Sequence, residues 1–153
     1  MKFKHLAASL ATIVAVHGAT ALAEEQDANA EVGVIKLNVT NFSNDIGKLY
    51  ITVYDSKKTW LKEAVFSDEL VVSDNLRDDW IQTEISLPHG EYAISVHHDA
   101  NGNEKMDSNF IGIPKEPVGM SKNQVPKFGP PKFKKSVFSL GSEPHEENIQ
   151  LLD

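Results

Sequence analysis

The sequence predicts an all-β fold, an antiparallel β-sandwich of about seven strands with one long ordered loop. Apolar and polar residues alternate over several short runs, which is the period-two pattern of half-buried strands. Clusters of Gly, Pro, Asn and Asp separate these runs at short intervals, as they do in sandwiches. No run has the apolar periodicity of a long helix.

The first two predicted strands cover residues 35–40 and 49–54. In each of them every second residue is apolar, so one face of the strand is expected to be buried. The residues between them, 44–47, read Asn-Asp-Ile-Gly and are typical of a turn. We therefore expect the two strands to be antiparallel neighbours.

A second strong pair of strands covers residues 81–87 and 92–98, on either side of Pro88-His89-Gly90. Because Pro and Gly favour a turn between two such runs, we expect a β-hairpin. This hairpin would place Asp99 at the end of a strand and at the start of the long loop.

One helical turn and three weaker strands complete the predicted elements. Residues 55–64 begin with Asp-Ser, whose side-chain oxygens can accept hydrogen bonds from the free amides of a helical turn. Weaker strands are predicted at 70–72, 137–140 and 149–151.

Residues 1–23 have the organisation of a secretory signal peptide. Lysines precede an apolar run over residues 6–16, and Ala21-Leu22-Ala23 supplies the small side chains of a cleavage site. The run is too short for a transmembrane helix, which needs about 20 apolar residues. We expect cleavage after Ala23, a flexible tail over 24–31, a single sandwich domain over 32–153 and no transmembrane segment.

The chain has 15 basic and 22 acidic residues, which give a formal net charge of −7. Such a balance repels nucleic acid, so nucleic acid is not an expected partner. The sequence contains no cysteine, which excludes disulfides and a lipid-anchoring cysteine. With the leader, these observations predict a soluble periplasmic or secreted protein that is not a lipoprotein.

The first part of the long loop has the side chains of a calcium-binding turn. Asp99, Asn101, Asn103 and Asp107 occupy positions one, three, five and nine, and Lys105 at position seven can contribute its backbone carbonyl. Calcium takes six to eight oxygen ligands, and a tight loop with oxygens at alternate positions can wrap around it. The spacing resembles the start of an EF-hand loop and predicts calcium as the cofactor, with a modest dissociation constant of about 10⁻⁴ to 10⁻³ M.

The match to an EF-hand loop is partial. Glu104 replaces the glycine of position six, and Phe110 replaces the bidentate glutamate of position twelve. The missing acidic ligand would then come from Glu104, from Glu116 or from water. The alternative is a metal-free turn, in which Asp and Asn side chains bind their own backbone amides.

Two adjacent histidines, His97 and His98, precede the loop. Neighbouring strand residues point to opposite faces, so the pair is not expected to hold one metal ion. His98 lies on the apolar face of its strand, which favours a hydrogen-bonded core histidine. The competing hypothesis is a hydrolase in which His98 works with Asp99 or Asp107 as acid and base, although no nucleophile stands at a recognisable spacing.

The rest of the loop, residues 110–135, is rich in lysine and apolar residues. Six lysines stand against one acidic residue, Glu116. They can bind an anionic ligand or a membrane surface, but pairing with the acidic remainder of the chain is the simpler interpretation. The apolar residues between them are expected to anchor the loop to the sandwich. They are Phe110, Ile111, Ile113, Val118, Met120, Phe128 and Phe133.

The chain resembles the secreted bacterial family catalogued as domain of unknown function 2141. The resemblance rests on HDANGNEKMDSNFIGIPKEPVGMSKN, the later KFGPPKF, YDS at 54–56 and LPHGEY at 87–92. It implies a transthyretin-like or immunoglobulin-like β-sandwich without an assigned activity. Glu104 departs from the family's usual glycine. Hydroxyisourate hydrolases have a similar sandwich, but the Tyr-Arg-Gly-Ser ending that they need is absent from this chain.

These features predict a non-enzymatic exported binding or accessory module with a calcium-stabilised loop at residues 99–107. Its expected partner is a protein, a glycan or another component of the cell envelope. The alternatives are a hydrolase-type enzyme using His98 with Asp99 or Asp107, and a structural envelope protein.

Overall fold

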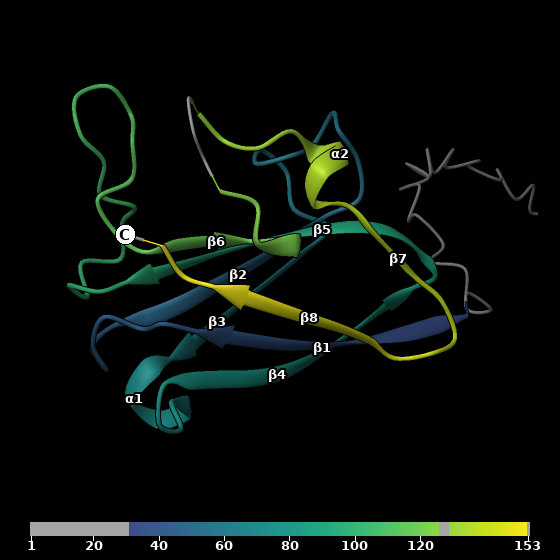
Figure 1. Ribbon diagram of the computed structural model, residues 1–153, viewed down its shortest axis with the longest axis horizontal. Helices are drawn as coiled ribbons and strands as arrows, with labels where there is room; N and C mark the ends of the chain where they lie inside the picture. Colours follow the sequence, from purple (N-terminus) through teal and green to yellow (C-terminus); the bar gives the residue numbers. More distant parts are fainter. Residues whose placement is uncertain (1–30, 126–128, 153) are drawn as a thin grey trace, which may run out of the picture.

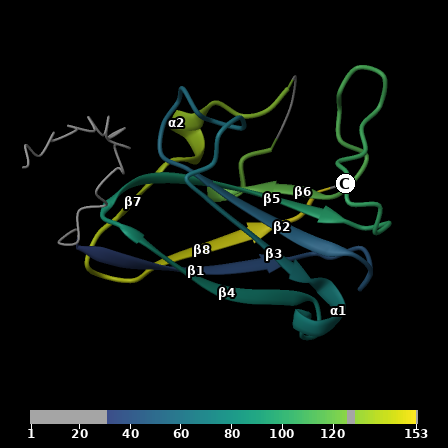
Figure 2. The same cartoon turned by 180° about the vertical axis from the view of Figure 1, so that it is seen from behind.

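The computed structural model describes residues 31–125 and 129–152 of the chain. These residues form two facing β-sheets, which confirms the predicted all-β sandwich (Figures 1 and 2). The predicted leader and residues 24–30 of the predicted tail lie outside the described residues. Over 31–125 and 129–152, no helix has the length and apolar character needed to cross a membrane.

The first sheet has three strands in the order β4-β1-β8. They are β1 (Val32–Thr40), β4 (Trp80–Pro88) and β8 (His145–Gln150). The second sheet has five strands in the order β3-β2-β5-β6, with β7 paired to another stretch of β5. They are β2 (Lys48–Tyr54), β3 (Phe66–Val71), β5 (Gly90–Asp99), β6 (Val118–Met120) and β7 (Phe138–Leu140). The short helical elements are α1 (Val72–Asn75), η1 (Ser121–Asn123) and α2 (Phe133–Ser136).

The core lies between the two sheets and consists of the alternating apolar residues of their strands. On β1 and β2 every second side chain is fully buried, as the alternation predicts. Burial of each such side chain is worth about 1.5–3 kcal/mol, so this face holds the sheets together. These side chains are Ile35, Leu37, Val39, Leu49, Ile51 and Val53.

β1 and β2 are not neighbours, so the predicted antiparallel pair is wrong. β1 pairs antiparallel with β4 and parallel with β8, whereas β2 pairs antiparallel with β3 and β5. Alternation identifies the face that a strand buries but not the strand beside it. The segment between β1 and β2 therefore carries the chain from one sheet to the other.

The predicted hairpin at Pro88-His89-Gly90 is also wrong. Only His89 separates β4 from β5, yet the two strands belong to different sheets. One residue is too short a connection for a hairpin, which needs at least two. It suffices for a bend, so the chain leaves the first sheet at Pro88 and enters the second at Gly90.

The turn at residues 55–64 packs against the second sheet and against the end of the long loop. The amide of Trp60 donates to the Ser56 carbonyl at 3.0 Å. Its indole ring lies edge-on to Tyr54 and donates to the Pro131 carbonyl at 2.8 Å. The long loop is not free of secondary structure, because β6 and η1 lie within it and attach it to β5.

Candidate functional site

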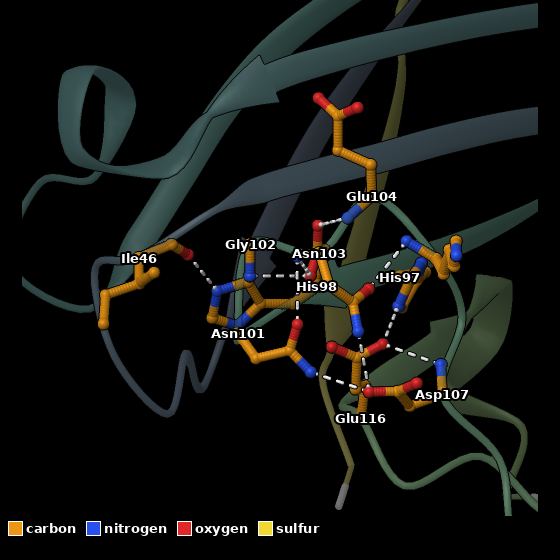
Figure 3. Close-up of polar contacts among 11 residues, drawn as sticks. Ile46, His97, His98, Asn101, Gly102, Asn103, Glu104, Asp107 and Glu116 are labelled. Atoms are coloured by element: carbon orange, nitrogen blue, oxygen red, sulfur yellow. Dashed lines mark hydrogen bonds and ion pairs between the residues drawn. The ribbon is translucent and has the colours of Figure 1, made fainter.

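The end of β5 places His97 and His98 on opposite faces of the second sheet, as expected for adjacent strand residues. His98 is buried in the sandwich, where its Nε2 donates to the Ile46 carbonyl at 2.9 Å. His97 lies on the other face, stacked on Tyr50 with 5.6 Å between ring centroids. The hypothesis of a core histidine at position 98 thus agrees with the structure (Figure 3).

Asp99 closes the turn that follows β5. Its carboxylate is 0% exposed and accepts three backbone amides, from Gly102 at 2.9 Å, Asn103 at 3.2 Å and Glu104 at 2.8 Å. Burial alone would raise the pKa of Asp99, but these amides, that of Glu104 first, outweigh burial and hold the pKa below its ordinary value. The carboxylate is therefore kept ionised inside the loop.

Glu104 adopts the left-handed conformation that glycine normally takes at this position of a calcium loop, with φ of 61°. For a residue with a side chain this conformation costs about 1–2 kcal/mol. Its carboxylate pairs with Lys48 at 3.2 Å and points away from the other polar side chains of the loop (Figure 3). Of the two acidic residues considered for the missing ligand, Glu104 does not reach the loop's centre.

Three of the predicted ligands lie together. The Asn101 and Asn103 amides donate to the same oxygen, Oδ2 of Asp107, at 2.7 and 3.0 Å. The amide oxygens accept backbone N–H groups two residues further on, of Asn103 at 3.0 Å and of Lys105 at 2.9 Å. The loop described is thus closed by its own hydrogen bonds.

Glu116, at the end of residues 107–116, contacts Asp107 of this loop. Its side chain is only 5% exposed. Oε2 accepts Nε2 of His97 at 2.8 Å and the backbone amide of Asp107 at 3.0 Å. Among the described residues, no three His, Cys, Asp or Glu side chains form a group that could hold a metal ion. A cation here would therefore need amide and backbone oxygens in addition to carboxylates.

Residues 107–116, hereafter the finger, form a narrow projection above β6 in Figure 1 and stand clear of both sheets in Figure 2. At its base, Lys115 donates its amide to the Asp107 carbonyl at 2.8 Å. Nearer the tip, the Asn109 amide bonds the Ile113 carbonyl at 2.8 Å, and the Gly112 amide bonds the Asn109 carbonyl at 2.9 Å. The Asn109 side chain accepts two further amides of the tip, each at 3.0 Å. The finger therefore has a defined shape.

The tip of the finger is apolar and exposed. Phe110 is 99% exposed, Ile111 65% and Ile113 53%. The prediction that these residues anchor the loop to the sandwich is wrong. The available signal was the pair Asn109 and Gly112, since both residue types favour turns and a projecting turn exposes the side chains it carries.

The other apolar residues of the lysine-rich segment do pack. Met120 is buried, and Val118 is half-buried. Phe133 is half-buried with its ring edge-on to that of Trp60. Phe128 lies outside the described residues. Anchoring is thus confirmed at the end of the long loop and at β6, but not at the finger.

The predicted pairing of the lysine-rich segment with the acidic remainder is not found. Lys115, Lys122, Lys132, Lys134 and Lys135 form no ion pair with any residue in 31–125 or 129–152. The acidic residue of the segment, Glu116, bonds His97 instead. Exposed lysines near the finger therefore keep their charge available to a partner.

Comparison with known proteins gives one family. The model of a family described as "Uncharacterized protein conserved in bacteria (DUF2141)" matches residues 37–148. No curated protein and no solved structure matches the chain. The matched region contains the Asp99 loop, Glu116 and the whole finger.

Proposed function

The chain belongs to the DUF2141 family of bacterial proteins, and we propose that it is an exported, non-enzymatic module that binds a lipid membrane surface through the finger. The observation that carries this proposal is the 99% exposure of Phe110 at the tip of a hydrogen-bonded projection. Large apolar side chains gathered on one exposed feature of a folded protein typically mark a contact site.

The shape of the finger favours binding. Its hydrogen bonds hold the tip in one conformation before any partner is met, so little conformational entropy is lost on contact. Its three apolar side chains are exposed at the tip of a narrow projection (Figure 1). A narrow apolar wedge suits insertion between lipid headgroups, where each large side chain can gain up to about 1.5–3 kcal/mol.

The charge around the finger favours an anionic surface. Lys105 precedes the finger and Lys115 lies at its base; both are exposed and form no ion pair with a described residue. A lysine near an anionic membrane contributes about 1 kcal/mol. The nearby carboxylates of Glu104 and Glu116 have partners of their own, since Glu104 pairs with Lys48 and Glu116 bonds His97. Acidic residues elsewhere in the chain are screened over about 10 Å at 0.1 M salt.

The burial of His98 supports a binding role over the hydrolase alternative. A general base must reach a substrate within hydrogen-bond distance, or through one water. His98 is 0% exposed, and its Nε2 is already bonded to the Ile46 carbonyl.

Co-sedimentation with vesicles of phosphatidylethanolamine and phosphatidylglycerol tests the proposal. The purified protein, its amino terminus determined by mass spectrometry, is expected to bind weakly and reversibly, at about 10⁴ M⁻¹, the strength of a single acyl anchor. Phe110→Ser should lower binding at least about tenfold, and Lys115→Gln about fivefold. Phe110→Trp should become accessible to quenchers attached to the lipid chains.

Val32→Ser is the matched control. Val32 is exposed at the start of β1, which lies at the end of the sandwich remote from the finger (Figures 1 and 2), so its substitution should not affect vesicle binding. Equal vesicle binding by the wild type and Phe110→Ser would contradict the proposal. If vesicles fail to bind while Phe110→Ser abolishes a cross-link to an envelope protein, the partner is a protein and the membrane assignment is wrong.

A further inference from the structure

Glu116 has a buried carboxylate oxygen without a hydrogen-bond partner. Its Oε2 accepts two hydrogen bonds, whereas Oε1 is sealed from solvent and bonded to no described residue. A buried polar atom left without a partner is destabilising and needs a physical explanation. In Figure 3 this free oxygen points away from His97 and toward the side where Asn101 and Asn103 lie.

We propose that calcium is the missing partner, and that Glu116 supplies the carboxylate that the Asp99 loop lacks. In the described conformation Asp99, Asp107 and Glu116 do not form a metal-binding group, so the loop has to close on the ion. Closure would bring together three carboxylates, two amide oxygens and one backbone carbonyl as six oxygen donors, which suits a hard cation that takes six to eight. These donors belong to Asp99, Asn101, Asn103, Lys105, Asp107 and Glu116. With no nitrogen or sulfur ligand, the set favours calcium over zinc or copper.

The two asparagines provide the means of closing on a cation. Both now direct Nδ2 toward Oδ2 of Asp107, so that nitrogen donors meet a carboxylate oxygen. Rotation of each amide exchanges nitrogen for oxygen at nearly the same place. Three oxygens facing one another repel unless a cation lies among them. After this rotation the Asn103 backbone amide keeps its bond to Asp99 at 3.2 Å, and the exposed Lys105 amide can bind water.

His97 acts as a positioning residue for Glu116. It donates to Oε2 at 2.8 Å while its ring is held by stacking on Tyr50. This bond fixes the orientation of the carboxylate and leaves Oε1 free, which is the usual role of an outer partner of a metal ligand.

The proposed calcium site would also hold the base of the finger. Asp107 and Glu116 are its first and last residues, and the Asp107 amide already bonds Glu116. One cation bound to both would keep the two ends of the finger together. The site itself does not depend on membrane binding, so each proposal can fail while the other stands.

Titration calorimetry of the full protein with calcium chloride tests the site. The wild type should bind one calcium ion with a dissociation constant of about 10⁻⁴ to 10⁻³ M. At a saturating calcium concentration, thermal unfolding should shift upward by several degrees relative to chelator. Magnesium should give a smaller effect, because it demands a stricter octahedral geometry.

The variants Glu116→Gln and Asp107→Asn should each weaken calcium binding at least about tenfold, since each removes one ligand charge. Glu104→Gln is the matched control and should bind within about twofold of the wild type, because its carboxylate pairs with Lys48 instead. The calcium-dependent shift in melting temperature is compared within each variant, which cancels any general loss of stability.

Absence of heat in the wild type, or unchanged affinity in Glu116→Gln, would overturn the proposal. Phe110→Ser should keep full calcium affinity.

Discussion

The hydroxyl of Tyr92 donates a hydrogen bond of 2.9 Å to the backbone carbonyl of Pro88. Pro88 ends β4 in the first sheet, and Tyr92 lies near the start of β5 in the second. The bond therefore spans the bend at which the chain changes sheets. Gly90 leaves room for the tyrosine ring, because an added Cβ there would lie only 3.3 Å from ring atoms. Similar tyrosine corners occur in other sandwiches.

Removal of this hydroxyl should destabilise the fold. Tyr92→Phe is expected to lower the free energy of unfolding by about 0.5–1.5 kcal/mol, and more if the Pro88 carbonyl is left without a partner. Urea denaturation monitored by tryptophan fluorescence measures the change. Tyr50→Phe is the control, because the Tyr50 hydroxyl bonds no described residue. Equal losses in the two variants would show that the bond to Pro88 contributes nothing.

Tyr92 should also make stability depend on alkaline pH. Burial, with a smaller contribution from the charge of Asp55, raises the pKa of Tyr92 above its ordinary value of 10.0. A group whose pKa is raised by folding contributes full stability below the unfolded pKa and loses it as pH rises through the folded pKa. The free energy of unfolding should therefore fall above pH 10, and Tyr92→Phe should fall less steeply. Parallel curves would contradict this prediction.

Gly119 allows β6 to pack closely against β8. An added Cβ would overlap the Ile149 side chain and lie 3.0 Å from the Gln150 carbonyl oxygen. Gly119→Ala should therefore cost about 1–3 kcal/mol through overpacking. Gly141→Ala provides the comparison, because nothing lies within 4 Å of its added Cβ. Chemical denaturation of both variants gives the difference, and a neutral Gly119→Ala would contradict the described packing.

Glu104 stores backbone strain in the Asp99 loop. Glu104→Gly and Glu104→Ala both remove the exposed pair with Lys48, but only glycine relieves the positive φ of 61°. The glycine variant should therefore be more stable than the alanine variant by about 1 kcal/mol. Thermal unfolding in chelator measures this difference without any contribution from a metal. Equal stabilities would mean that the loop relaxes around residue 104.

The sequence predicts the inside of this sandwich better than its strand order. Alternation correctly assigned the buried faces of β1 and β2, because burial is a property of each strand alone. The neighbours of β1 depend on where the chain crosses between sheets, and both connections looked like ordinary turns. The parallel partner β8 lies at the other end of the described chain, where no local pattern refers to β1.

The sequence likewise predicted the local part of the candidate site but not the contacts that depend on the rest of the fold. The turn at Asp99 follows from side chains at alternate positions, a purely local signal. That Glu116 bonds the Asp107 amide, while Glu104 pairs with Lys48, depends on how the finger folds back on itself. The exposed Phe110 was predicted to be an anchor because an apolar residue carries no information about whether it packs inward or awaits a partner.

The pairing of β1 with β8 affects how the protein can fold after synthesis. Residues that face each other in these two strands are 110 residues apart in the sequence. One such pair, Asn38 and Asn148, is joined by a side-chain hydrogen bond of 2.9 Å. Since a ribosome delivers the amino end first, β1 keeps an open edge until β8 has emerged. Contacts of such long sequence separation also make folding slow. The strands of the second sheet all precede β8, so the second sheet can form before the first sheet is complete.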